Sequence, residues 1–213
     1  MEDLLAIGMD GEETNFDKLF RRAIGVLDSA RYSYVLAGAL ALDLYVPPRF
    51  TDQIHILCQH NEHAPIASAL AASGFAITQS APSIATLKAA DAKGYIVLNG
   101  SDSSAMRYAL MHATQRQVFS VTARVVSPQA LLWLFLESDE IQHHADAIAL
   151  IESGLVSPEE IQDLLTREGA GAALAKYMNL WADIRDGRYA RTYSDSVKAR
   201  VLRNRKNDAE RRR

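Results

Sequence analysis

The sequence is poor in the features that mark secreted or membrane proteins. Its single cysteine, Cys58, cannot form an intrachain disulfide, which fits a reducing cytosol. No uncharged apolar run approaches the roughly 18 residues that a membrane-spanning helix needs, and the acidic N-terminus lacks the basic start and apolar core of a secretory signal. These absences predict a cytoplasmic globular protein without a membrane span, and Cys58 is expected to be a buried, unreactive thiol within a strand.

Charge is ordinary in amount but unevenly distributed. The formal net charge is −3, yet residues 183–213 carry a net +6, so residues 1–182 carry −9. A basic C-terminal segment on an acidic body can contact nucleic-acid phosphates or an acidic partner. It can equally dock on its own body or remain a solvated helix, and it lacks the interleaved aromatic residues that stack on bases.

Residues 1–126 alternate between helical and strand-like patterns, which predicts one α/β domain. A helix is expected from Asn15 or Asp17 to about Ala30, followed by further helices over Glu62–Ser73 and Ser103–Ala113. Strands are expected at Tyr34–Ala37, Gln53–Cys58, Phe75–Thr78, Ile84–Lys88, Gly94–Leu98 and Val118–Val126.

Residues 127–213 read as a helical region that ends in the basic tail. Two Ser-Pro pairs, at Ser127 and Ser157, each place a capping serine before a proline at the first helical position. One helix is expected directly after each Ser-Pro pair. Two more are expected over Asp139–Glu152 and Ala172–Ile184, and a last one from Asp195 to about Arg212.

The most informative stretch runs from Tyr34 to Cys58. A short buried strand ends at Gly38, a small helix is expected from Ala39 to Tyr45, and two prolines close it. The second strand alternates, so that Gln53 and His55 share one face. A turn of this kind can offer backbone amides to phosphate groups.

This layout resembles the nucleotidyltransferase fold, and in particular the small bacterial nucleotidyltransferase-like proteins that include toxin–antitoxin and abortive-infection members. Their motif is a strand into Gly-Gly or Gly-Ser, a short helix, and Arg-x-Thr-x-Asp-x-Asp on the next strand. The matching residues are Gly38, Ala39, Arg49, Thr51, Gln53 and His55. The Ser-Pro helix at Ser127 and the position of Asp146 on the following helix also resemble the family. The resemblance implies an α+β fold, with a mixed sheet flanked by helices and a helical array after it.

The sequence departs from this motif where the family's chemistry lies. In active members, the two aspartates hold magnesium, which prefers anionic oxygen ligands in octahedral geometry. Here those positions are Gln53, with one neutral oxygen, and His55, with a nitrogen that suits zinc or copper better. Asp52 points to the opposite strand face unless a bulge redirects it, and Gly94–Gly100, the plausible segment for a third carboxylate, contains no acid. No metal site and no cofactor are therefore expected.

Gly38, Ala39, Arg49 and Thr51 could retain a vestigial site for nucleotide or phosphate, or could only brace the turn. The leading hypothesis is a catalytically degenerate nucleotidyltransferase-like protein that acts as a binding or regulatory module, with a protein partner or as a homodimer. One alternative is a divergent but active enzyme that transfers a nucleoside monophosphate and needs magnesium. Another is a nucleic-acid-associated protein that uses its basic C-terminal helix.

Overall fold

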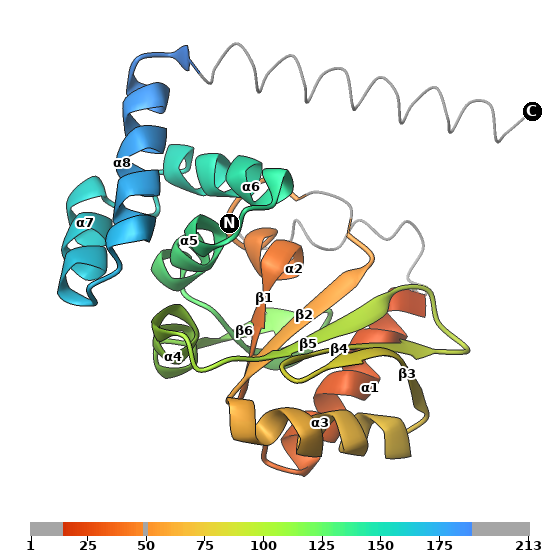
Figure 1. Cartoon of the computed structure of the whole chain (residues 1–213). Helices are drawn as coiled ribbons and strands as arrows, with labels where there is room; N and C mark the ends of the chain where they lie inside the picture. Colours follow the sequence, from red (N-terminus) through yellow and green to blue (C-terminus); the bar gives the residue numbers. More distant parts are fainter. Residues whose placement is uncertain (1–14, 49–50, 189–213) are drawn as a thin grey trace, which may run out of the picture. The chain divides into compact units, whose positions relative to one another are not determined.

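The computed structural model describes residues 15–48 and 51–188 (Figure 1). The chain divides into two compact units, the first ending at Leu134 and the second beginning at Phe135. Arg49 and the predicted helix from Asp195 to about Arg212 lie outside the described residues. In these residues no helix is both long enough and apolar enough to cross a membrane.

The first unit is built on a mixed sheet of seven strands with the order β3-β4-β5-β2-β1-β7-β6. Its strands are β1 (Tyr34–Ala37), β2 (Gln53–Cys58), β3 (Phe75–Ala81), β4 (Ile84–Ala89), β5 (Tyr95–Gly100), β6 (Thr114–Val118) and β7 (Val121–Val125). Its helices are α1 (Asn15–Ser29), α2 (Gly38–Leu42), α3 (His60–Ala72) and α4 (Ser104–Met111), and α5 (Pro128–Glu137) runs across the boundary between the units. The α+β fold class expected from the sequence is confirmed.

The centre of the sheet combines antiparallel and parallel pairing. Strand β1 runs antiparallel to β2 and parallel to β7, while β2 runs parallel to β5. Apolar residues at alternate positions of β2, β4 and β5 are fully or almost fully buried: Ile54, Ile56, Ala85, Leu87, Ile96 and Leu98. Helices α1 and α3 lie side by side on one face of the sheet, and α3 contacts β3, β4 and β5 (Figure 1).

The strand predicted over Val118–Val126 begins too early, because β7 covers only Val121–Val125 and Val118 ends a separate strand, β6, which the sequence did not predict and which a tight hairpin joins to β7. Phe119 and Ser120 form the turn with φ values of 46° and 63°, and such a turn normally uses glycine or asparagine. The sequence therefore shows no turn signal here. The ring of Phe119 packs edge-on against Phe16 and Phe20, with centroids 5.8 and 5.4 Å away, and these contacts help to hold the turn.

Helix α2 ends at Leu42, three residues earlier than the sequence predicts. Beyond it the backbone tightens into three-residue turns, with the amide of Leu44 donating to the carbonyl of Ala41 and that of Tyr45 to the carbonyl of Leu42. The Tyr45 hydroxyl donates to the Val126 carbonyl at 2.5 Å. This bond ties the turns that follow α2 to Val126, the residue directly after β7.

The second unit is helical, as expected, and contains α6 (Ile141–Glu152), α7 (Pro158–Arg167) and α8 (Gly171–Arg185). The Ser157 hydroxyl accepts the amide of Glu160 at 3.1 Å, so its predicted role as a helix cap is confirmed. Ser127 caps α5 in the same way, through the amide of Ala130 at 3.3 Å.

Candidate functional site

The pairing of β1 with β2 brings the motif residues together. Ala37, the residue before Gly38, lies opposite His55 in the antiparallel register. Gly38 begins α2 with a φ of 66°, a conformation that glycine adopts without steric cost. The glycine turn and the strand position of the second expected aspartate are therefore direct neighbours.

The side chain of His55 packs directly over the glycine turn. A Cβ atom added to Gly38 would lie 2.9 Å from Cγ of His55 and 3.1 Å from its Cδ2. These distances are shorter than ordinary van der Waals contact. The imidazole thus occupies the space into which a side chain at position 38 would project.

Gln53 and His55 also bond to each other. Nε2 of His55 and Oε1 of Gln53 are 2.8 Å apart, and because an amide oxygen only accepts, the imidazole Nε2–H is the donor. Both side chains are half-buried and lie on one strand face, as the alternation predicts. The amide oxygen, which is the best magnesium ligand of the pair, is already used as an acceptor.

The other motif residues have structural contacts. Ala39 is buried, as are all five residues of α2. The Thr51 hydroxyl accepts the Gln53 amide at 3.2 Å and so holds the start of β2. Arg49, the remaining predicted phosphate ligand, lies outside the described residues.

Strand β5 continues the half-buried face that begins with Gln53 and His55. In the parallel register Tyr95 lies beside Gln53 and Val97 beside His55, and Asn99 follows two residues later. All three are half-buried, and Lys88 of β4 lies over the Tyr95 ring, 5.6 Å from its centroid. The face that β2 and β5 share carries no charged residue of β5.

Sequence reasoning noted only that Gly94–Gly100 lacks an acid, and it did not identify these residues as part of the same face. The Tyr-x-Val-x-Asn alternation from Tyr95 to Asn99 is the available signal. The pairing partner of that strand, which joins the two strands into one face, cannot be read from local sequence.

Asp52 does not replace the missing carboxylates. Strand β2 pairs with β5 without interruption from Gln53 to Cys58, so no bulge in this register redirects Asp52. Its side chain is exposed and its backbone carbonyl accepts the Tyr95 amide at 2.9 Å. The pKa of the Tyr95 hydroxyl is raised, mainly by burial and secondly by the negative charge of Asp52.

Cys58 and its neighbouring histidines have separate environments. Cys58 is a free, fully buried thiol as predicted, and burial together with the charge of Glu62 raises its pKa to about 12. His63 is buried against Gly100, and burial lowers its pKa. His60 is exposed and bonds the Gly100 carbonyl through Nδ1 at 3.1 Å. Within residues 15–48 and 51–188, no group of three or more His, Cys, Asp or Glu side chains could hold a metal ion.

Asp146, the position matched to the family in the helical unit, is almost completely buried. The side-chain amide of Gln142, one turn earlier on α6, donates to Oδ1 of Asp146 at 3.3 Å. Asp146 is thus a fixed part of the helical unit, where a buried carboxylate must be paired or hydrogen-bonded.

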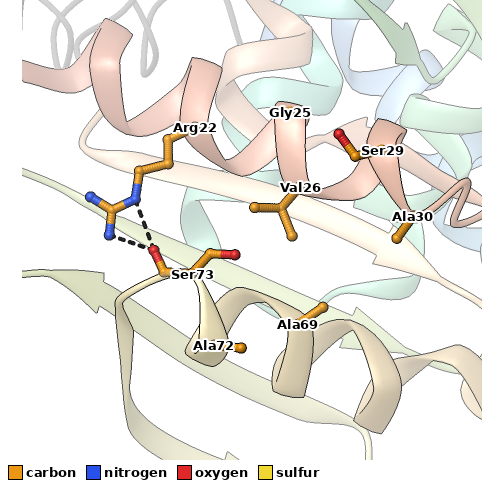
Figure 2. A pocket seen from close by; sticks show the side chains of 8 residues that line it. All are labelled: Arg22, Gly25, Val26, Ser29, Ala30, Ala69, Ala72 and Ser73. Carbon is orange, nitrogen blue, oxygen red and sulfur yellow. Dashed lines mark hydrogen bonds between the residues drawn. The ribbon is translucent and has the colours of Figure 1, made fainter.

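A shallow groove of about 700 Å³ lies between α1 and α3 (Figure 2). Small residues line most of it: Gly25, Val26, Ser29, Ala30, Ala69, Ala72 and Ser73. Arg22 lies at its edge and donates to the Ser73 carbonyl at 2.9 and 3.2 Å, and it also pairs with Asp91 at 3.2 Å. None of the motif residues lines this groove. Arg22, the one cationic side chain among its lining residues, is already bonded to Ser73 and Asp91.

No family model matches the chain, and no curated protein matches it in sequence. Solved structures with a related arrangement exist. The antibiotic-resistance factor ANT(2'')-Ia aligns with a TM-score of 0.48 at 14% identity, covering 85% of this chain and 97% of that one. The lincosamide adenylyltransferase LnuA aligns with a TM-score of 0.48 at 16% identity, covering 67% and 99%. An antigenic nucleotidyltransferase-like protein from Paracoccidioides brasiliensis gives 0.46 at 15%, covering 76% and 93%.

In the described residues, β1, the glycine turn, α2 and β2 follow one another in the order of the nucleotidyltransferase motif that the sequence resembles. Likeness at 14–16% identity and TM-scores of 0.46–0.48 says nothing about activity or substrate.

Proposed function

We propose that this protein is a catalytically degenerate nucleotidyltransferase-like protein that acts as a binding or regulatory module. The observation that carries the proposal is the pair formed by Gln53 and His55, which bond each other at 2.8 Å while the imidazole packs over Gly38. The strand, glycine turn, short helix and second strand of the motif are all present. The residues at the two expected metal-ligand positions, Gln53 and His55, are not carboxylates, and the imidazole fills the space over Gly38.

The residues present do not fit magnesium. The cation needs anionic oxygen ligands at about 2.0–2.1 Å in octahedral geometry, whereas this strand offers one amide oxygen, already accepting a hydrogen bond, and one imidazole. The adjacent β5 offers Tyr95, Val97 and Asn99 on the same face, none of them a carboxylate. In metal-assisted phosphoryl transfer the metal neutralises charge and positions the phosphates. Without anionic ligands to hold a metal, this site offers neither function.

A labelled-nucleotide transfer assay tests the proposal. Each of the four nucleoside triphosphates is offered with magnesium or manganese, with the protein itself and with small alcohols as acceptors. We expect no nucleotide transfer above the background rate measured with heat-denatured protein. Robust transfer of a nucleoside monophosphate that Arg49→Ala abolishes would contradict the proposal and favour the divergent enzyme.

A calorimetric titration separates binding from catalysis. If the module retains nucleotide binding, it binds equally well in magnesium and in EDTA, because no residue at the site prefers the metal complex. The matched variant His55→Ala opens the space above Gly38 and should strengthen such binding. Binding that requires magnesium would show that the metal site survives.

A further inference from the structure

Strand β3 is an edge of the sheet and, within the described part of the chain, pairs only with β4. Six of its seven residues, Ala76 to Ala81, are exposed. One side of this strand therefore presents unpaired backbone amides and carbonyls, which are ready to pair with another strand. Ile77 on β3 and Ile84 on β4 are each 45% exposed, which adds apolar area beside the edge.

Strand β3 itself carries no charged residue, and the charged groups near it lie around its start, where Arg22 packs over Phe75 and Lys88 of β4 lies opposite Ala76. From His63 to Leu87 the sequence contains 25 consecutive residues without a single Asp, Glu, Lys or Arg, although 23% of the whole chain is charged. This run comprises most of α3, all of β3, the turn after it and most of β4. Depletion of charge is the compositional mark of the centre of a protein interface.

Natural edge strands are usually protected by lysine, proline or a bulge. Strand β3 has one such device, a bulge between Ile77 and Gln79, and it has no charged residue and no proline. The opposite edge, β6, differs because Arg116 lies in its centre and its other exposed residues are polar. The two edges are thus unequally protected, and β3 is the one open to pairing.

We propose that β3 pairs antiparallel with β3 of a second copy of this chain, which forms a two-fold dimer with a continuous sheet. The composition of β3 favours this partner, because the strand contains no Asp, Glu, Lys or Arg and two copies can approach along it without charge repulsion between the paired residues. Antiparallel pairing of one strand with its own copy is self-complementary and places no like charges opposite each other. The dimer is closed, since each copy contributes the same β3 edge to the contact.

Two matched variants of the full chain test the dimer by analytical ultracentrifugation over a dilution series. Gln79→Lys introduces a charge into the exposed centre of β3, and Gln115→Lys introduces the same charge into the exposed part of β6. We expect the wild-type chain and Gln115→Lys to share one dimer dissociation constant and Gln79→Lys to weaken it at least about tenfold. A monomeric wild-type chain, or equal dissociation constants for the two variants, would overturn the proposal.

Hydrogen–deuterium exchange on the wild-type chain gives a second measurement that needs no variant. Amides of Phe75–Ala81 should become protected as the protein concentration rises, while those of Thr114–Val118 remain unchanged. A dimer without added protection on β3 would place the contact elsewhere and refute the pairing. Neither measurement depends on nucleotide transfer, so this inference and the proposed function can fail independently.

Discussion

The packing of His55 over Gly38 makes a quantitative prediction about the stability of the site. Replacing Gly38 with alanine forces a side chain onto a residue with a φ of 66° and places its Cβ 2.9 Å from Cγ of His55. The backbone term costs about 1–2 kcal/mol, and overpacking against the ring adds about 1–3 kcal/mol. Gly38→Ala should therefore destabilise the first unit by about 2–5 kcal/mol.

The two terms can be separated with a double-mutant cycle. In a His55→Ala background the ring is absent, so Gly38→Ala should cost only the backbone term, and the coupling energy should be about 1–3 kcal/mol. Urea unfolding is followed by the fluorescence of Trp133, which is fully buried in the first unit. The Trp181→Phe background removes the only other tryptophan.

The cycle also has a clear negative outcome. A coupling energy below about 0.5 kcal/mol is what independent sites show. It would mean that the imidazole does not rest on the glycine turn, and the space above the turn would then be open to a ligand. The physical basis of the proposed function would be lost with it.

Three further changes have expected outcomes. Because burial raises the pKa of Cys58 from 9.0 to about 12, the folded state holds that proton longer than the unfolded state; stability is complete below pH 9 and falls above it by up to about 1.4 kcal/mol per pH unit. Cys58→Ala should make this slope shallower in urea titrations between pH 9 and 10, while the buried tyrosines Tyr34, Tyr45 and Tyr177, whose pKa values are also raised by burial, keep the remainder. An unchanged slope would refute the prediction. Ser120→Gly should stabilise the hairpin by about 0.5–1 kcal/mol in urea unfolding by relieving a φ of 63°; destabilisation would contradict this reading of the turn. Arg22→Lys should cost about 1 kcal/mol, because lysine cannot reproduce the two bonds to Ser73, and an unchanged urea midpoint would show that this clamp adds nothing.

Sequence patterns predicted the features that are determined by residues close to one another in the chain. The Ser-Pro pairs at Ser127 and Ser157 start helices because the cap and the proline act within one turn. The alternation of Gln53 and His55 predicted one shared face for the same reason, and the structure joins these side chains by a hydrogen bond.

The parts that sequence could not predict depend on distant contacts. The turn at Phe119 and Ser120 lacks the usual turn residues, and Phe119 packs against α1, about a hundred residues earlier in the chain. The face shared by β2 and β5 likewise follows from pairing between segments some forty residues apart. In each case a long-range contact, and not local propensity, determines the outcome.

Under the proposed function, the identity of Gln53 and His55 accounts for a motif frame that is stable without a metal. Two aspartates two residues apart on one strand face repel each other unless a cation lies between them. Gln53 and His55 replace that repulsion with a hydrogen bond and fill the space over Gly38. The apo state is then the relaxed state of the strand, because nothing in it needs a ligand to balance charge. Introducing only one carboxylate, as in His55→Asp, would break this bond and uncover the turn without supplying a second anionic ligand for magnesium, so we expect a less stable protein that does not gain a magnesium site.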